Sequence, residues 1–216
     1  MTPTAIRIEN LVRDFGPVRA VDGLSLEVPA GIIFGFLGPN GAGKTTTIRI
    51  LTGLTRLTGG SAMLGGHDIE LQTLAAKEQY GLVPQHINLD SELTVHENLR
   101  VHGLLHHMPR QAIGPRTDEL LGYIDLTEKR DTLVKKVSGG MKRRVMIARA
   151  LVHRPKLILA DEPTAALDKE SGAEVIKLLK QLARDEGCTI LLVTHDNRIL
   201  DAADRIINMV DGHIVT

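Results

Sequence analysis

The chain has 216 residues, 43% of them hydrophobic and 24% charged, which is the composition of a folded domain and excludes a disordered chain. Lysine plus arginine and aspartate plus glutamate number 26 each, so the basic excess typical of non-specific nucleic-acid binding is absent and we expect no nucleic-acid partner. The single cysteine rules out an internal disulfide. No apolar run approaches the roughly 20 residues that a membrane span requires, so we expect a membrane role only through a partner.

The first third of the chain is predicted to be rich in strands. Short alternating or apolar stretches predict them at positions 6–8, 24–28, 32–37, 61–64 and 80–83. The third of these is apolar except for Gly35, as a strand buried on both faces should be. It runs into a glycine-rich loop, after which a helix is predicted over 45–54, ending near Gly53.

The middle of the chain, from about residue 86 to 136, has a different pattern. Its apolar positions follow a helical spacing and its histidines cluster. We interpret it as a helical insertion packed on an α/β core. His102 and His106 fall on one helix face, with His96 and His107 nearby, but no cysteine or carboxylate is placed to complete a metal site. We therefore interpret these histidines as part of a solvated face.

Helices and strands alternate from about residue 138 onward. A helix is predicted from 138 to about 154, where Pro155 stops it, and a later helix has Val175, Leu178, Leu179 and Leu182 on one face. Buried strands are predicted at 157–160 and 190–193, and Asp211–Gly212 is typical of a hairpin turn. This alternation predicts one α/β domain over residues 1–216, with a mainly parallel sheet and helices on both faces.

The glycine-rich loop after the strand at 32–37 fits the phosphate-binding pattern G-x-x-x-x-G-K-[ST]. Its glycines let backbone N–H groups turn toward phosphate oxygens, and the following helix points its positive end at the same anion. Lys44 would reach the β- and γ-phosphates of ATP, and the Thr45 hydroxyl would hold Mg²⁺. The predicted nucleotide-binding residues here are Gly38, Pro39, Asn40, Gly41, Ala42, Gly43, Lys44, Thr45 and Thr46.

A second apolar strand ends in two carboxylates, Asp161 and Glu162. The carboxyl ends of parallel strands share one edge of the sheet, where ligands of such folds bind. We predict that Asp161 holds the Mg²⁺ shell together with Thr45. Glu162 is then the predicted catalytic base that orients the attacking water.

Ser138, Gly139 and Gly140 open the helix that follows the insertion. Serine is a favoured N-cap, and the two glycines expose backbone amides at the positive end of the helix. The three residues therefore predict a second anion-binding segment, with tight packing at the helix start as the alternative. The basic run at 142–144 is interpreted as a charged helix face.

Together and in this order, the motifs resemble those of the nucleotide-binding domain of ATP-binding cassette (ABC) transporters, over essentially the whole chain. Positions 38–45 resemble Walker A, and 157–162 resemble Walker B with its catalytic glutamate. Positions 137–141 resemble the signature, with Val137 and Met141 in place of the usual Leu and Gln, and 165–168 resemble the D-loop. The resemblance implies a P-loop NTPase core with a mainly parallel sheet, an antiparallel β subdomain and the helical insertion.

The resemblance also implies the roles of three further residues and the identity of two kinds of partner protein. Gln85 would contact Mg²⁺ and the nucleotide, His195 would contact the γ-phosphate as a second catalytic residue, and Phe15 would stack on adenine. A second ATP-binding domain, the same or a close homologue, would pair head to tail so that 38–45 of one meets 138–140 of the other. Integral membrane permease subunits would hold the protein at the cytoplasmic face of the cell membrane.

The direction of transport is predicted from two segments. Positions 138–144 and 194–205 resemble ATPases of exporters, which favours export. One alternative is a soluble ABC ATPase of DNA repair, chromosome organisation or translation. Another is a nucleotide-gated adaptor without turnover, and the presence of both predicted catalytic residues argues against it.

Overall fold

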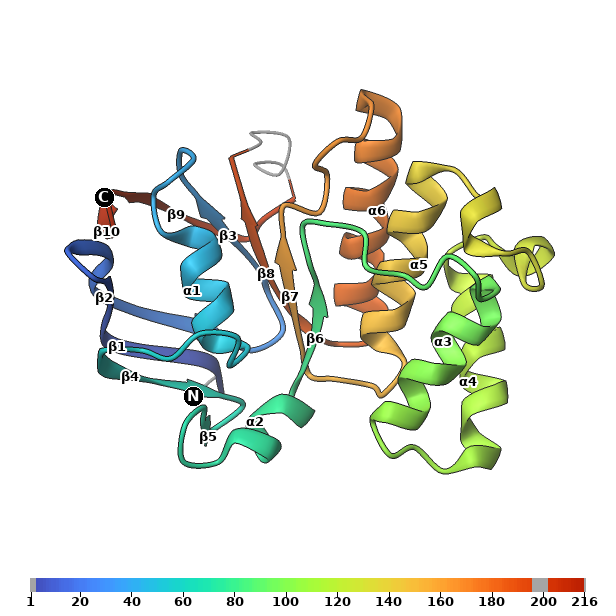
Figure 1. Cartoon of the computed structure of the whole chain (residues 1–216), viewed down its shortest axis with the longest axis horizontal. Coiled ribbons are helices and arrows are strands. Elements are labelled where there is room, and N and C mark those ends of the chain that lie inside the picture. Colours follow the sequence, from blue (N-terminus) through green and yellow to red (C-terminus); the bar gives the residue numbers. More distant parts are fainter. Residues whose placement is uncertain (1–2, 196–201, 216) are drawn as a thin grey trace.

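A computed structural model describes residues 3–195 and 202–215 (Figure 1), so positions 196–201 of the exporter-like segment lie outside the described residues. The strands are β1 (Thr4–Phe15), β2 (Val18–Pro29), β3 (Ile33–Leu37), β4 (Gly59–Leu64), β5 (His67–Asp68), β6 (Tyr80–Val83), β7 (Leu157–Asp161), β8 (Thr189–Thr194), β9 (Arg205–Val210) and β10 (His213–Val215). The helices are α1 (Lys44–Leu51), α2 (Thr73–Glu78), α3 (Val95–Leu105), α4 (Arg110–Tyr123), α5 (Gly139–Leu151) and α6 (Lys169–Asp185), with 3-10 turns at Thr127–Lys129 and Val134–Lys136.

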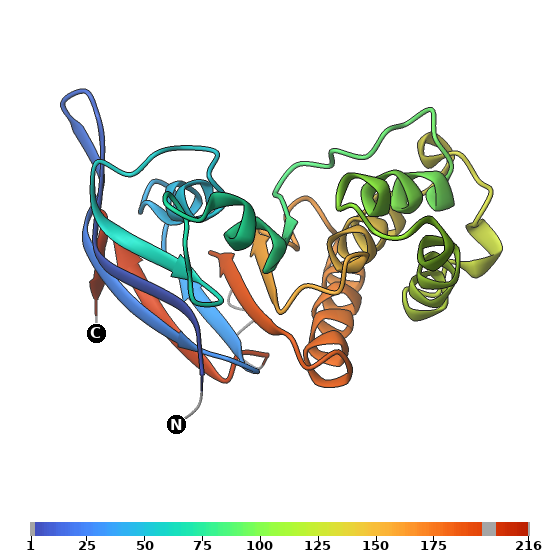
Figure 2. The same ribbon diagram turned by 90° about the horizontal axis from the view of Figure 1, so that it is seen from below.

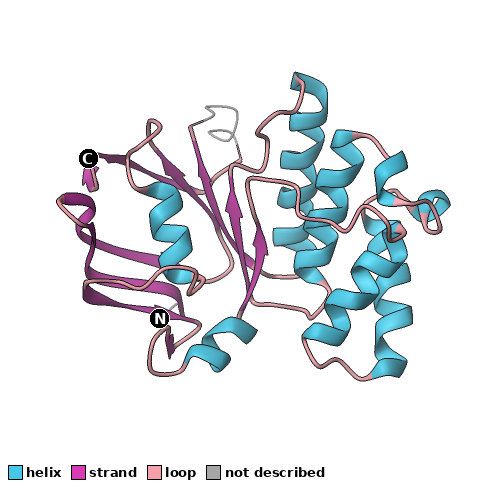
Figure 3. Cartoon of the chain, viewed as in Figure 1, coloured by secondary structure: helices cyan, strands magenta, loops and turns pink. Residues whose placement is uncertain are grey.

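The strands form two sheets. The larger has the order β10-β9-β3-β8-β7-β6, and its neighbours pair in parallel except for the β9–β10 hairpin. The smaller, in the order β2-β1-β4-β5, is antiparallel. A mainly parallel sheet beside an antiparallel one confirms the predicted fold class. In Figure 3 the strands gather on one side and most helices on the other.

The central strands are buried on both faces because their side chains alternate between two cores. In β3, Phe34 and Phe36 pack with α1 and the antiparallel sheet, whereas Ile33 and Leu37 pack with α5 and α6. The continuous apolar run read from the sequence follows from this arrangement. It also confirms helices on both faces of the parallel sheet, α1 on one and α5 with α6 on the other (Figure 1).

The stretch predicted as a helical insertion holds α3 and α4, far from the antiparallel sheet (Figure 2). A capping box starts α3: the Thr94 hydroxyl accepts from the Glu97 N–H at 3.1 Å, and the Glu97 carboxylate accepts from the Thr94 N–H at 2.8 Å. A bridge between Thr94 and Leu133 closes the segment at its base. In the described part of the chain, no helix is both long and apolar enough to span a bilayer.

One helix boundary differs from its prediction. The helix predicted to reach about residue 154 ends at Leu151, four residues before Pro155. Arg154 then takes a left-handed backbone conformation with φ 55°. The α conformation is disfavoured directly before a proline, so the chain has already left the helix when it reaches Pro155.

Candidate nucleotide site

The predicted phosphate loop lies between β3 and α1 and borders a hollow of about 310 Å³. Residues 40–46 line this hollow together with Ala20, Gln85 and Glu162. The fold thus brings the loop, the end of β6 and the end of β7 to one place. These three segments are far apart in the sequence and meet because β3, β7 and β6 are parallel strands of one sheet.

Two loop glycines are needed because the backbone of other strands comes close. A Cβ at Gly38 would lie 2.2 Å from the Met209 carbonyl oxygen of β9, and one at Gly43 would lie 2.4 Å from the Ala20 carbonyl oxygen of β2. The Gly212 N–H of the β9–β10 turn donates to the Ala42 carbonyl at 3.0 Å. The hairpin that Asp211–Gly212 predicted therefore supports the loop, a role that the sequence did not reveal.

Lys44 is folded inside the loop that precedes it. Its Nζ donates to the carbonyl oxygens of Gly38 at 2.8 Å and Pro39 at 2.9 Å, and only 5% of the residue is exposed. Burial lowers the pKa of this amine, while Glu162 and Asp161 nearby favour its charged form. The loop thus holds a positive charge next to the amino terminus of α1.

Thr45 and Asp161 form the second part of the site. The Thr45 hydroxyl donates to the Asp161 carboxylate at 3.1 Å, which joins the start of α1 to the end of β7. Burial raises the pKa of Asp161, and the Thr45 hydrogen bond and Lys44 act in the opposite direction. Hydroxyl and carboxylate oxygens beside the hollow are the hard ligands that Mg²⁺ prefers, so the residues present fit this ion.

The two predicted catalytic residues are in direct contact. The Glu162 carboxylate accepts from the Thr194 hydroxyl at 2.7 Å and from the His195 backbone N–H at 3.2 Å, and His195 Nδ1 lies 2.8 Å from it. Because a carboxylate only accepts, Nδ1 is the protonated nitrogen of this ring. Glu162 has a left-handed φ of 48° and is buried, and its backbone N–H donates to the Val193 carbonyl of β8 at 2.8 Å.

Ser138, Gly139 and Gly140 lie apart from the hollow, and none of them lines it. The Ser138 hydroxyl caps α5 by accepting from the Met141 N–H at 3.2 Å. Gly139 has open space around it, whereas a Cβ at Gly140 would lie 3.2 Å from Ser171 Oγ of α6. The tight-packing alternative therefore fits Gly140 and not Gly139.

Phe15 ends β1 and is 45% exposed. The Arg13 guanidinium lies 4.3 Å from the centre of its ring. Phe15 does not line the hollow, to which Ala20 contributes from the neighbouring strand. Its predicted contact with adenine stays a prediction.

Arg143 was missed by the sequence reasoning, which placed it on a charged helix face. It is buried, and its guanidinium donates to the carbonyl oxygens of Pro84 and Gln85 at 2.8 Å each and to that of Ala165 at 3.5 Å. Arg143 therefore ties α5 to the Gln85 loop and to the loop after Glu162. A usable signal was its helical spacing from the apolar Met146 and Ile147, which places it on a buried face.

The histidines of α3 also correct an interpretation. His102 and His106 are half-buried and their rings lie next to that of His153, which follows α5. They do not form a solvated face, because α3 packs this side against the end of α5. The sequence placed His102 and His106 together but gave no sign of the third ring, 47 residues after His106.

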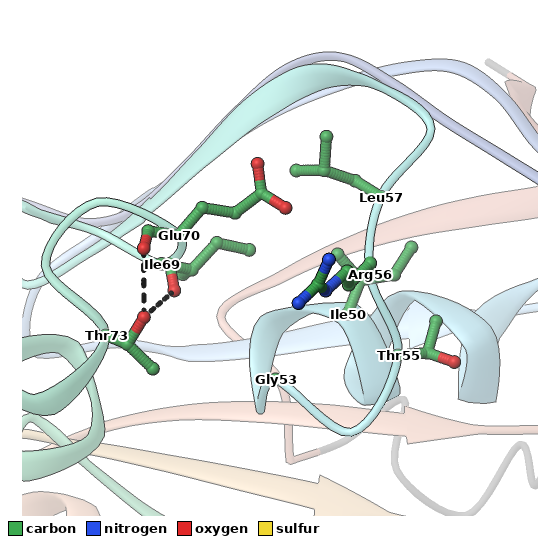
Figure 4. Close-up of a pocket in the computed structure, with 8 residues that line it drawn as sticks. All are labelled: Ile50, Gly53, Thr55, Arg56, Leu57, Ile69, Glu70 and Thr73. Atoms are coloured by element: carbon green, nitrogen blue, oxygen red, sulfur yellow. Dashed lines mark hydrogen bonds between the residues drawn. The ribbon is translucent and has the colours of Figure 1, made fainter.

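A different hollow of about 310 Å³ lies at the carboxyl end of α1 (Figure 4). Its wall includes Ile50, Arg56 and Glu70, and the Thr73 hydroxyl beside them donates to the carbonyl oxygens of Ile69 and Glu70. The negative end of a helix disfavours anions, so this hollow does not compete with the loop for phosphate.

The comparisons with known proteins agree with this geometry. The family described as "ABC transporter" matches residues 21–165. A methionine import ATP-binding protein of Mannheimia succiniciproducens is 41% identical over 199 residues, 88% of this chain and 58% of that protein. A Nod factor export ATP-binding protein of Cupriavidus metallidurans is 41% identical over 203 residues, 94% of this chain and 66% of that protein.

A solved dimeric ATP-binding cassette, in a post-hydrolysis state with ADP and Pi, matches with a TM-score of 0.85 and 29% identity over 98% of this chain and 97% of that one. The chain spans about three fifths to two thirds of the length of the curated relatives it matches. Their printed names include both import and export, so they favour neither direction. The match over residues 21–165 and these identities show that the chain belongs to the ABC transporter family, among its ATP-binding proteins.

Proposed function

We propose that this chain binds and hydrolyses ATP with Mg²⁺ as the ATP-binding subunit of a transporter. The observation that carries the proposal is the convergence of Lys44, the Thr45–Asp161 pair and Glu162 around one hollow. A basic group, a hydroxyl–carboxylate pair and a second carboxylate are the groups that phosphoryl transfer to water from MgATP requires.

The phosphates bind to the backbone N–H groups of residues 40–46 and to the amino terminus of α1. Lys44 exchanges its two carbonyl partners for phosphate oxygens. Thr45 and Asp161 hold Mg²⁺, with Gln85 at the same hollow as a further oxygen ligand. When bound, Mg²⁺ stabilises the negative charge that develops on the phosphate oxygens.

Glu162 orients the attacking water and accepts its proton at a carboxylate oxygen. Thr194 and the His195 N–H fix the direction of that carboxylate, so little reorganisation is needed during the reaction. His195 donates through Nδ1 to Glu162, and the Nε2 of its exposed ring donates to a γ-phosphate oxygen when both ring nitrogens are protonated.

A second copy, or a close homologue, completes each site. Ser138 and Gly139 are exposed and lie outside the hollow of their own chain, which supports a role for this helix start toward the nucleotide of a partner. The dimeric cassette with ADP and Pi among the similar structures supports pairing of two such chains.

Membrane-spanning subunits are the other proposed partners, and they place the protein at the cytoplasmic face of the membrane. Support comes from large apolar side chains that are exposed on the Gln85 loop and on α3. They are Ile87 (45% exposed), Val101 (42%), Leu104 (41%) and Leu105 (69%). A contact on these elements would pass motion of Gln85 to the permease.

The test of hydrolysis compares Glu162→Gln with Glu128→Gln, an exposed carboxylate in a 3-10 turn. We expect Glu162→Gln to lower phosphate release from MgATP by a factor of at least about 100, since a general base typically contributes that much. Binding of a fluorescent ATP analogue should persist in both variants. Unchanged phosphate release in Glu162→Gln would remove this residue as the base.

The test of the transport role uses the same Glu162→Gln variant, tagged and extracted from native membranes with mild detergent. Mass spectrometry of the co-purified proteins should identify an integral membrane protein. Recovery of soluble proteins or nucleic acid alone would favour a soluble ATPase instead.

A further inference from the structure

Three histidines form a cluster outside the nucleotide site. His102 lies in α3, His106 is the residue that caps the carboxyl end of α3, and His153 follows α5. One ring nitrogen from each lies within 4.8 Å of the other two. The rings of His106 and His153 stack with their centres 3.7 Å apart, and that of His102 is tilted against them. Among the described residues, this is the group of three histidines, cysteines or carboxylates whose ligand atoms lie close enough together to hold one metal ion.

Backbone packing holds the cluster in place. His102 and His106 are one helical turn apart, and the His106 N–H donates to the His102 carbonyl at 3.1 Å, so their side chains lie on the same side of the end of α3. Gly103 between them allows α3 to come close, because a Cβ there would lie 3.2 Å from Val152 Cγ1, next to His153. The cluster therefore rests on a tight contact between α3 and the end of α5 (Figure 1).

His153 is oriented with a free lone pair. Its Nε2 lies 3.1 Å from the Tyr80 carbonyl oxygen, which can only accept, so Nε2 carries the proton. Its Nδ1 is buried and has no hydrogen-bond partner in the described structure. A histidine whose one nitrogen donates to a carbonyl while the other is unprotonated is arranged as a metal ligand usually is.

The other rings are also suited to binding a cation in their neutral form. Burial is the largest cause that lowers the pKa of His102 to about 3 and that of His153 to about 4, and burial lowers the pKa of His106 as well. A neutral imidazole offers a lone pair to a metal without first losing a proton, and burial favours that form of all three rings.

We propose that His102, His106 and His153 bind a divalent transition-metal ion of the zinc type, with water as the fourth ligand. Three imidazoles and an open position are a known ligand set for zinc, and neutral nitrogen ligands exclude Mg²⁺ and Ca²⁺ as preferred ions. A tetrahedral ion with bonds of about 2.0–2.1 Å needs ligand nitrogens about 3.3 Å apart, so the nitrogens draw in by at most about 1.5 Å from 4.8 Å. For this change the His106 ring would turn out of its stack with His153.

Charged neighbours set the strength of binding. The Arg149 charge acts on His102 and that of Arg116 on His153, and both disfavour a nearby cation, while the Glu78 carboxylate acts on His106 and favours one. Arg116 is neutralised by an ion pair with Glu186 at 3.0 Å. The Arg149 guanidinium donates to Asn88 and has no ion pair among the described residues, so its charge opposes a cation and we expect micromolar and not nanomolar affinity.

The bound ion would join the insertion to the core. His153 is anchored to Tyr80, the first residue of β6, and β6 ends two residues before Gln85. A metal at the cluster therefore fixes α3 to the strand that carries the Gln85 loop.

The test is a titration of untagged, chelator-treated protein with Co²⁺ in excess Mg²⁺, which saturates oxygen sites. We expect one Co²⁺ per chain, the intense visible absorption of tetrahedral cobalt, displacement by Zn²⁺, and a rise in thermal unfolding midpoint with Zn²⁺. His153→Gln and His106→Gln should each weaken binding at least tenfold. The matched control is His107→Gln, which alters an exposed histidine beside the cluster and should bind as the wild type does.

Binding of an ATP analogue by every variant verifies that each is folded. Absence of tetrahedral cobalt absorption in the wild type would overturn the proposal. So would equal cobalt affinity in His153→Gln, His106→Gln and wild type, because the ion would then be bound elsewhere.

Discussion

At the scale of single residues, the neutral histidines make the metal-free protein sensitive to acid. The folded state resists protonation of His102 and His153 until the pH falls to about 3 and 4, whereas in the unfolded chain these rings take up protons near pH 6.5. Below pH 6.5 the unfolded state therefore binds more protons than the folded one. Stability is fully present above that pH and is lost progressively as the pH falls through the folded-state pKa values.

This leads to a prediction for urea unfolding in chelator at pH 7 and pH 5. The wild type should lose about 1 kcal/mol of unfolding free energy for each of the two rings over this interval, after allowance for partial solvent exposure. The double variant His102→Gln/His153→Gln should lose correspondingly less, and His107→Gln should follow the wild type. An equal loss in the double variant and the wild type would contradict the assignment.

At the scale of secondary-structure elements, one arginine joins three segments of the site. Arg143 of α5 donates to two carbonyls of the Gln85 loop and to that of Ala165 in the loop after Glu162. Buried carbonyl oxygens that lose a charged donor are left unsatisfied, which is costly in the interior. A change at Arg143 should therefore act on stability and on the placement of both loops.

We predict that Arg143→Met, which keeps most of the side-chain volume, lowers the free energy of unfolding by about 2–4 kcal/mol. It should lower kcat for ATP more than it raises KM, because Gln85 and Glu162 are displaced while the phosphate loop is intact. Arg143→Lys should recover part of kcat, since an amine can reach one of the carbonyls. Chemical denaturation and steady-state phosphate release measure these effects.

Lys142→Met is the matched control on the same helix, and its free energy of unfolding should stay within about 0.5 kcal/mol of the wild type. A kcat equal to that of the wild type in folded Arg143→Met would show that Arg143 has no positioning role.

Elements defined by local pattern were predictable from the sequence. The strand β6 has the predicted bounds, β7 is one residue longer at one end, and β8 is one residue longer at each end, because long apolar runs between turns identify buried strands. The helix α2 and the two-residue strand β5 were not predicted. Both are short, β5 is half-buried and three of the six residues of α2 are exposed, and such elements have no periodic apolar pattern.

Site residues that lie at the ends of buried strands could be predicted from the sequence. Residues whose partners are set by tertiary packing could not. Asp161 and Glu162 end a buried strand, and the parallel sheet brings them to the phosphate loop. Arg143 and His153, in contrast, acquire their surroundings from segments that are distant in sequence. No local pattern specifies which carbonyl or ring will lie opposite such a side chain.

At the scale of the whole molecule, the two predicted anion-binding segments lie on opposite faces of one sheet. The phosphate loop precedes α1 on one face, and Ser138–Gly140 precede α5 on the other (Figure 1). Because α1 and α5 lie on opposite faces of the sheet, their amino termini cannot bind the same phosphate within one chain. A second chain in head-to-tail orientation can instead place the start of its α5 at the phosphate loop. A substitution at the start of α5 should therefore be able to prevent dimerisation without weakening ATP binding by the single chain.

Gly139 offers a way to separate them. Gly139 is exposed and is the first residue of α5, and a Cβ at this position would have nothing within 4 Å, so an aspartate fits in the single chain. A carboxylate in the first turn of a helix is mildly stabilising, so folding should not suffer. In a dimer, the same carboxylate would face the phosphates of the partner's nucleotide and repel them.

We predict that Gly139→Asp binds an ATP analogue as tightly as the wild type and has an equal or slightly higher unfolding midpoint, but loses most phosphate release. In the Glu162→Gln background, light scattering should show an ATP-dependent dimer, and the double variant Glu162→Gln/Gly139→Asp should stay monomeric. Lys136→Asp, an exposed change before the helix, is the charge control and should still dimerise. If the double variant formed dimers with ATP as readily as Glu162→Gln alone, Gly139 would not face the partner's nucleotide, and the helix start would be no more than a cap.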